Sequence, residues 1–341
     1  MENVLLLVHT EADGSLGKAS LEALGAARSL GGSLTAGLVG GDVRAAANRI
    51  AGCGAGRFLA VSGEAFRQPR YASDAAAAEA ICRAAGAAIV IAAGTSRWAR
   101  VLPGVAQRLG GRVDTHVTGV FLADGKPALT RWYYRQRMEA TLQRTERPWV
   151  ILVDPGCHTA WSGEAGTADV QPLAVDLPAS LRTTVTGVRA PQADQQTIRP
   201  EADLLFVAGA GWTKKQSDGA AHPEEAERLI LDFLHVAKAS LGSSKSLVDL
   251  SGEGQAVLRF MTHLNQVGQT GATPRHPKGL STCCHGEEPH VVGWRFITER
   301  RAINLDPNCG WARGKADVLY VADAFAVMRR VNALLAEKQP A

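Results

Sequence analysis

The chain has 341 residues, of which 46% are hydrophobic, and its formal net charge of +4 is spread along its length. This amount of apolar material predicts two ordinary domains rather than one large core. Lys and Arg form neither a run nor a periodic face, so the composition does not favour a nucleic-acid-binding protein. The apolar run VLLLV near the N-terminus is too short for a signal peptide, and no other segment resembles a membrane span. We therefore expect a cytoplasmic protein without membrane insertion.

Short apolar runs alternate with helix-like segments in the first part of the chain. Strands are expected at residues 4–8, 33–40, 57–62 and 87–94. Between them lie the helix-like segments SLGKASLEALGAARSL, DVRAAANRIAG and SDAAAAEAICRAAG. This order is typical of a parallel sheet covered by helices on both faces.

The rhythm changes after Arg112, where the pieces HVTGVFLADGKPALTRWYY and RPWVILVDPG read as short strands with a hairpin turn at Asp124 and Gly125. They predict an antiparallel extension of the first sheet. Residues 156 to about 200 carry no long periodic segment and are interpreted as a domain connection with one strand at most. We place the domains at 1–190 and 191–341.

A second alternating block begins with ADLLFVAGAGW at 202–212 and continues with a helix at roughly 223–240. The pieces KSLVDLSGEG, LSTCCHGEEPHVVGW, RRAINLDP and DVLYVADAFAVMRRVNALL follow and end in a helix. The fold class predicted for the whole chain is therefore α/β, with two doubly wound, mostly parallel sheets, the second of them Rossmann-like. Ligands of such sheets collect at the carboxyl ends of the strands.

The stretch STCCHGEEPH at 281–290 offers several potential metal ligands, namely Cys283, Cys284, His285 and His290. Adjacent cysteines on a strand point to opposite faces, and the chain has no CxxC pair of the kind used by structural zinc or thiol redox sites. A metal or thiol redox role is thus a minority interpretation. The simpler alternative is that one cysteine is buried and the other lines a pocket.

The segment NQVGQTGA at 265–272 resembles a motif of a known protein family. Together with His290, AIN at 302–304, INLDP at 303–307 and YVAD at 320–323, it resembles the flavin-binding domain of electron-transfer flavoprotein alpha subunits. That family carries Gln-Val-Gly-Gln-Thr-Gly, then Gly-Ile-Ser-Gly-Ala-Ile-Gln-His, Ala-Ile-Asn-Lys-Asp-Pro and Val-Ala-Asp. GSSKSLVD at 242–249 resembles its Gly-Ala-Ser-Arg-Ala-Ala-Val-Asp, and the N-terminal block is similar to its opening strands and helices.

The resemblance implies a heterodimer with an electron-transfer flavoprotein beta subunit that holds one non-covalent FAD, mostly in the C-terminal domain. It implies an electron carrier rather than an enzyme. Electrons would come from a flavin dehydrogenase of the acyl-CoA or N-methylated amine type and leave to a quinone-linked acceptor. The segment WYYRQRMEATLQR at 132–144 corresponds to a strand pair that packs on the beta subunit.

The same resemblance assigns residues to the flavin. Thr270 and Gln269 fall near the flavin N5 edge, Lys245 stands where the family has an arginine, and His290 falls near the flavin O2. Asn304 and Asp323 match positions on the AMP half of FAD. The complete set of cofactor-binding positions implied is Ser244, Lys245, Gln266, Val267, Gln269, Thr270, Gly271, Cys284, His285, Gly286, His290, Asn304 and Asp323.

The chain departs from the family pattern at two places. It reads AGAGW where the family has Gly-Gly-Arg-Gly, so an arginine is absent, and Lys214 or Lys215 is the candidate to replace it. Glu287 and Glu288 stand in the altered loop, where negative charge opposes a nearby pyrophosphate. The alternative hypothesis is therefore a binding module with this fold that has lost or exchanged its flavin.

Overall fold

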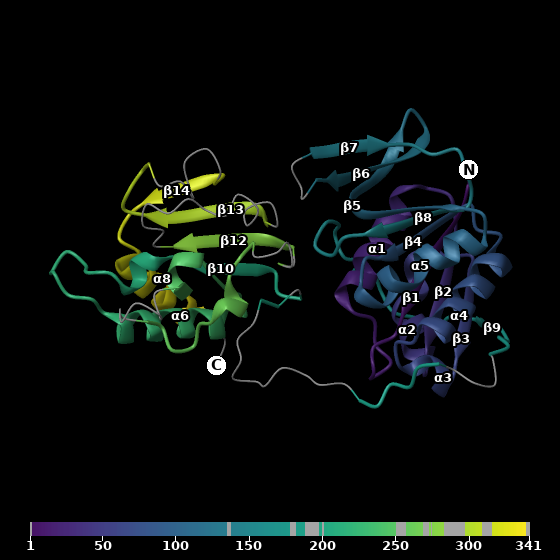
Figure 1. Cartoon of the computed structure of the whole chain (residues 1–341), viewed down its shortest axis with the longest axis horizontal. Coiled ribbons are helices and arrows are strands. Elements are labelled where there is room, and N and C mark those ends of the chain that lie inside the picture. The colour runs from purple at the N-terminus through teal and green to yellow at the C-terminus, as the bar shows by residue number, and fades with distance from the viewer. Residues whose placement is uncertain are drawn as a thin grey trace. The chain divides into compact units, whose positions relative to one another are not determined.

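The computed structural model describes residues 2–134, 138–177, 182–187, 198–199, 201–249, 257–268, 273, 275–282, 297–308 and 316–338. The chain divides into two compact units, Met1–Arg189 and Ala190–Ala341. Each unit is built around its own mostly or wholly parallel sheet (Figure 1). The predicted α/β class with two doubly wound sheets is confirmed.

A nine-stranded sheet in the order β7-β6-β5-β8-β4-β1-β2-β3-β9 forms the first unit. Its inner strands are continuous apolar runs, as expected for strands that are covered on both faces. Helices α1 and α2 pack on one face, and α4 and α5 pack on the other. The strands are β1 (Asn3–His9), β2 (Ser33–Gly40), β3 (Arg57–Ser62), β4 (Ile89–Ala93), β5 (Arg112–Ala123), β6 (Lys126–Tyr133), β7 (Met138–Leu142), β8 (Trp149–Val153) and β9 (Val170–Pro172), and the helices are α1 (Lys18–Ser29), α2 (Arg44–Arg49), α3 (Glu64–Arg67), α4 (Tyr71–Ala85) and α5 (Ser96–Arg108).

The four strands and three helices expected in the first block are confirmed within a few residues at their ends. The hairpin is confirmed as well, since Asp124 and Gly125 form a two-residue loop in which both have positive φ. One expectation was wrong: β8 does not belong to the antiparallel extension. It lies between β4 and β5 and pairs with both in parallel, because its fully buried WVILV sequence suits an interior strand.

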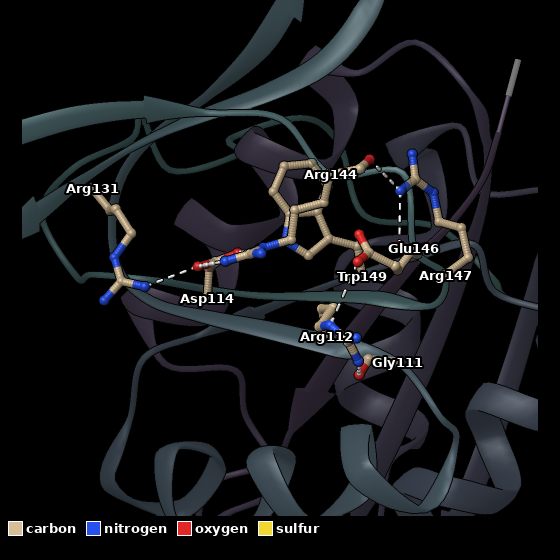
Figure 2. A network of polar contacts seen from close by, with 8 residues as sticks. All are labelled: Gly111, Arg112, Asp114, Arg131, Arg144, Glu146, Arg147 and Trp149. Atoms are coloured by element: carbon tan, nitrogen blue, oxygen red, sulfur yellow. Dashed lines mark hydrogen bonds and ion pairs between the residues drawn. The ribbon is translucent and has the colours of Figure 1, made fainter.

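The antiparallel extension consists of β5, β6 and β7, and a buried carboxylate joins it to the parallel sheet. Asp114 on β5 is fully buried and accepts hydrogen bonds from Arg131 Nη1 (2.9 Å), Arg144 Nη2 (2.9 Å) and Trp149 Nε1 (2.8 Å). These donors come from β6, from the segment after β7, and from β8. Figure 2 shows the donors gathered around Asp114. One carboxylate thereby holds the extension in register with the sheet.

Residues 154–177, which we call the strap, cross the edge of the first sheet and contact both of its cores. Trp161 packs into the core beside α1 and α2, and the Arg49 guanidinium lies over its ring at 5.0 Å from the centroid. β9 then pairs with β3, after which Leu173, Val175 and Leu177 pack on the opposite core. The segment expected to be a domain connection is thus, up to residue 177, part of the first unit's packing.

A five-stranded, wholly parallel sheet in the order β11-β10-β12-β13-β14 forms the second unit. α6 and α8 pack together on one face of it. The elements are β10 (Leu204–Ala208), β11 (Ser240–Ser243), β12 (His276–Thr282), β13 (Ile297–Asn304), β14 (Val318–Val321), α6 (Pro223–Ala237), α7 (Lys245–Asp249), α8 (Ala324–Glu337) and the short 3₁₀ turns η2 (Ala210–Thr213) and η4 (His263–Asn265).

KSLVD differs from its predicted strand-and-turn form, since it is the short helix α7. The strand is the preceding SLGS, because α6 ends at Ala237 and Lys238 adopts a left-handed conformation that stops the helix early. This shift places Lys245 beyond the carboxyl end of β11 rather than on its edge.

We expect Asp114→Asn to lower the free energy of unfolding of the first unit by about 3 kcal/mol, because two arginines with little exposure lose their counter-ion. Burial raises the pKa of Asp114, but hydrogen bonds from Arg144, Trp149 and Arg131 outweigh burial and hold that pKa below its usual range. The stabilisation should therefore be complete above about pH 4 and disappear as the pH falls through the lower pKa of the folded state. Denaturant unfolding at several pH values measures both effects, and the exposed turn variant Asp124→Asn is the control. Equal stability of the two variants would contradict the assignment.

The strap should weaken in mild acid because of His158. Burial lowers the pKa of His158, and its Nε2 is buried without a hydrogen-bond partner among the described residues. Protonation is then more costly in the folded state, so stability should be complete above about pH 6.5 and fall as the pH drops below that value. Hydrogen exchange of the strap at pH 7.5 and 5.5, corrected for intrinsic rates, measures this loss, and His158→Gln should reduce it. An unchanged pH dependence in the variant would rule out His158 as its source.

Candidate functional site

The carboxyl ends of the second sheet form the candidate site. The chain passes from β10 to β11 on one side, and β12 then joins β10 on its other side, so the strand order reverses between β10 and β12. In doubly wound sheets, ligands bind in the crevice beyond the carboxyl ends at such a reversal. Residues that immediately follow these strands are therefore the candidates for ligand contact.

Backbone and side-chain hydrogen bonds tie the ends of β10 and β12 together. The Gly209 amide donates to the Thr282 carbonyl at 2.8 Å, and Trp212 Nε1 donates to Thr282 Oγ1 at 2.9 Å. Trp212 is fully buried, and its ring lies 4.6 Å from that of Phe325 at the start of α8. The tryptophan thus belongs to the core that supports this edge.

Four of the predicted site residues gather at the end of β11. Ser244 follows the strand directly, Lys245 begins α7, and the Gln266–Val267 segment lies alongside. The Val267 amide donates to the Ser243 carbonyl at 3.0 Å, which joins the two segments. Ser244, Gln266 and Val267 are buried, whereas the Lys245 side chain is 58% exposed.

A glycine makes this approach possible. A Cβ on Gly242 would lie 2.5 Å from Val267 Cγ2, so any larger residue would push the Gln266–Val267 segment away from the sheet. Ser243, the last residue of β11, is fully buried, and its hydroxyl has no hydrogen-bond partner among the described residues. The Ser243 hydroxyl is therefore a buried hydrogen-bonding group at the strand end that no described residue uses.

Asn304 and Asp323 form a second group at the ends of β13 and β14. The Ala322 amide donates to the Asn304 carbonyl at 3.1 Å, which brings the two residues close in the structure. Asn304 is buried, and its Oδ1 accepts from the Asp306 amide at 3.0 Å. Asp323 caps α8, because its Oδ1 accepts from the Ala326 amide at 2.7 Å. Each of these two side chains therefore already accepts a hydrogen bond from a nearby backbone amide.

The two groups stand on the same edge but not in contact. β11 and β13 are three strand positions apart, which corresponds to about 14 Å at a spacing of about 4.8 Å between strands. A compact ligand could not reach both groups, whereas an elongated dinucleotide could lie across the edge. Hydroxyl, amide and ammonium groups at one end and amide and carboxylate groups at the other fit a flavin ring and a ribose respectively.

The remaining predicted site residues lie outside the described residues. They are Gln269, Thr270, Gly271, Cys284, His285, Gly286 and His290, and Cys283, Glu287 and Glu288 lie outside as well. Within the described ranges, no group of three or more His, Cys, Asp or Glu side chains is arranged to hold a metal ion. None of the described helices is long and apolar enough to cross a membrane.

The position without the family's arginine lies in η2. Ala210 is 1% exposed and presents only a methyl group there. Lys214 is partly buried immediately after η2, and Lys215 is exposed. Both lysines are therefore near the carboxyl end of β10.

Two polar arrangements were missed by the sequence analysis. One is the Asp114 network, whose only signal is a lone acid within a strand next to arginine-containing segments. The other is an ion-pair cluster beside the first group of site residues, in which Asp249 contacts both Lys245 and His263. His263 precedes the QVGQTG motif by only a few residues, but only the structure brings it to α7.

The antiparallel extension carries a second candidate surface, suited to a protein partner. Tyr134, Met138 and Leu122 are 73%, 54% and 45% exposed, and β7 is the outermost strand of the sheet. Arg131, which binds the buried Asp114, also lies over the Tyr133 ring at 4.4 Å from its centroid. Exposed aromatic and large apolar residues near a sheet edge are typical of protein interfaces.

Two doubly wound units, the first with an antiparallel extension, define the chain as a two-unit α/β protein. A model of the electron transfer flavoprotein domain matches residues 4–178, which is just over half of the chain. The chain therefore belongs to the electron transfer flavoprotein family, and the resemblance noted in the sequence is confirmed at that level. A search of curated proteins found no match. The match ends where the strap ends, so the candidate edge of the second sheet lies outside it.

We expect Asp323→Ala to destabilise α8 by about 1 kcal/mol, because the helix loses its N-cap acceptor. Asp323→Asn keeps an acceptor at the cap and should change the stability of the helix little. Hydrogen exchange of the α8 amides measures both variants. If Asn and Ala destabilised the helix equally, the capping role of Asp323 would be refuted.

Proposed function

We propose that the chain is the alpha-type subunit of a heterodimeric electron-transfer flavoprotein that carries electrons on FAD. Family membership supports an electron-transfer-flavoprotein-like role in general. The observation that carries the finer proposal is the convergence of Ser244, Gln266–Val267, Asn304 and Asp323 on one edge of a parallel sheet. These residues come from separate segments, and a doubly wound sheet uses that edge for dinucleotides.

In this proposal the group at β11 holds the flavin ring, and the group at β13 and β14 holds the nucleotide half. The Ser244, Gln266 and Val267 segments offer hydroxyl, amide and backbone groups, and Lys245 adds a positive charge that favours an anionic reduced flavin. Asn304 and Asp323 face the ribose side. Gln269, Thr270, Gly271, Cys284, His285, Gly286 and His290 complete the proposed set. Bound there, FAD would supply the electron storage, while the chain binds, orients and polarises it.

The proposed partner of the antiparallel extension is an electron-transfer flavoprotein beta subunit. Its exposed Tyr134, Met138 and Leu122 would form the contact. The complex would act as a carrier and not as an enzyme, located in the cytoplasm. A flavin dehydrogenase of the acyl-CoA or N-methylated amine type would reduce it, and a quinone-linked acceptor would oxidise it.

One observation favours a second candidate, a binding module without flavin. Ala210 stands where the family has an arginine, and it lies at the strand reversal where a cofactor would approach. If neither Lys214 nor Lys215 replaces that arginine, the edge loses a cation that would hold an anionic cofactor.

The visible spectrum of the chain purified together with its beta-type partner separates the two candidates. We expect a yellow complex with flavin bands and one FAD for each heterodimer. A colourless complex that fails to take up added FAD would contradict the carrier proposal and favour the binding module. Metal analysis of the same sample tests the metal interpretation of residues 283–290.

A further inference from the structure

Asp249 links two segments that meet at the carboxyl end of β11. Its Oδ2 lies 3.7 Å from Lys245 Nζ, one turn earlier on α7, and its Oδ1 lies 3.6 Å from His263 Nδ1 at the start of η4. Each carboxylate oxygen thus has its own cationic or potentially cationic partner. The acid is shared between the helix that carries Lys245 and the turn that leads into the QVGQTG motif.

Both segments are anchored close to this cluster. Ser244 connects β11 to α7, and its amide donates to the Ala208 carbonyl at 2.8 Å. The Asn265 side chain donates to the Leu241 carbonyl at 3.4 Å, and the Val267 amide donates to Ser243. The backbone on either side of these contacts is therefore fixed to the sheet, while the side chains of Lys245, Asp249 and His263 remain partly exposed.

The exposure of the three side chains limits how much their ion pairs stabilise the fold. The side chains of Lys245, Asp249 and His263 are 58%, 40% and 59% exposed, and ion pairs with this exposure contribute at most about 1 kcal/mol to stability. The cluster cannot be important for holding the fold. Its charge, however, acts on any ligand at this strand end over several ångströms.

We propose that Asp249 is a positioning residue that holds the side chains of Lys245 and His263 together beside the cofactor edge and offsets the positive charge of Lys245. This inference rests on the proposed flavin site and deepens it. With Asp249 ionised, the ammonium is held on α7 and its charge is largely compensated. Without Asp249, the net charge beside Ser244 and Gln266 is more positive by one unit, and the side chain of Lys245 is released.

Three variants test the proposal in the complex of the full chain with its beta-type partner. Asp249→Asn should increase the affinity for reduced flavin relative to oxidised flavin by about threefold, because a unit charge is removed at partly solvated range. Asp249→Glu keeps the charge and should retain the wild-type ratio. Asp232→Asn removes the same charge from an exposed position in the second half of α6 and should leave the ratio unchanged.

A second readout does not need flavin. In the flavin-free chain, Asp249→Asn should increase hydrogen exchange of residues 263–267 about twofold, since one weak ion pair to His263 is lost. If the complex held no flavin, the proposed function would fail, while this exchange measurement would still show whether Asp249 orders the turn.

Two outcomes would overturn the proposal. Asp249→Asn and Asp232→Asn with the same flavin affinity ratio would remove Asp249 from the cofactor site, whatever happens to the exchange rates. Unchanged exchange at residues 263–267 would refute the link between α7 and η4. A wild-type ratio in Asp249→Glu together with a shifted ratio in Asp249→Asn supports the assignment.

Discussion

Parallel pairing is the constraint on which the candidate site depends. Because all five strands of the second sheet run in one direction, every strand ends at the same edge, and the residues that follow each strand meet there. Ser244, Gln266, Asn304 and Asp323 are distant in the chain, yet each lies within a few residues of a strand end or beside one. The sheet does not need a dedicated pocket to bring them together. It needs only the hydrogen-bonded register that aligns the strand ends.

The sheet of the first unit differs, because it joins antiparallel strands to a parallel sheet. β5 pairs in parallel with β8 up to Val117 and antiparallel with β6 from Val117 onward, and an irregularity around Val117 shifts the register of both pairings. Asp114 precedes this irregularity and binds donors from three segments, so the transition occurs where a buried charge is fully satisfied. A buried carboxylate is tolerated only when it is paired and hydrogen-bonded. The same network keeps Arg131 beneath Tyr133, next to the surface proposed for the partner subunit.

The sequence predicted the strands and helices of the first block because apolar periodicity there is clean and the hairpin has an Asp-Gly turn. It did not predict the place of β8, since a short buried apolar run does not reveal its neighbours. It also misassigned KSLVD, because the early end of α6 depends on a left-handed Lys238 that no composition rule favours. Asp249 and His263 could not be paired from sequence, as their contact exists only once η4 folds back against β11. The motif residues Gln266 and Val267 could be found, because their signal is local.

The proposed flavin site is best tested by a crystal structure of the chain in complex with its beta-type partner, purified without added cofactor. We predict that the density of FAD lies across the carboxyl ends of β11, β10, β12 and β13, with its ring beside Ser244 and Gln266 and its ribose beside Asn304 and Asp323. Flavin density at any other place on the chain, or an edge closed by the protein's own side chains, would contradict this account.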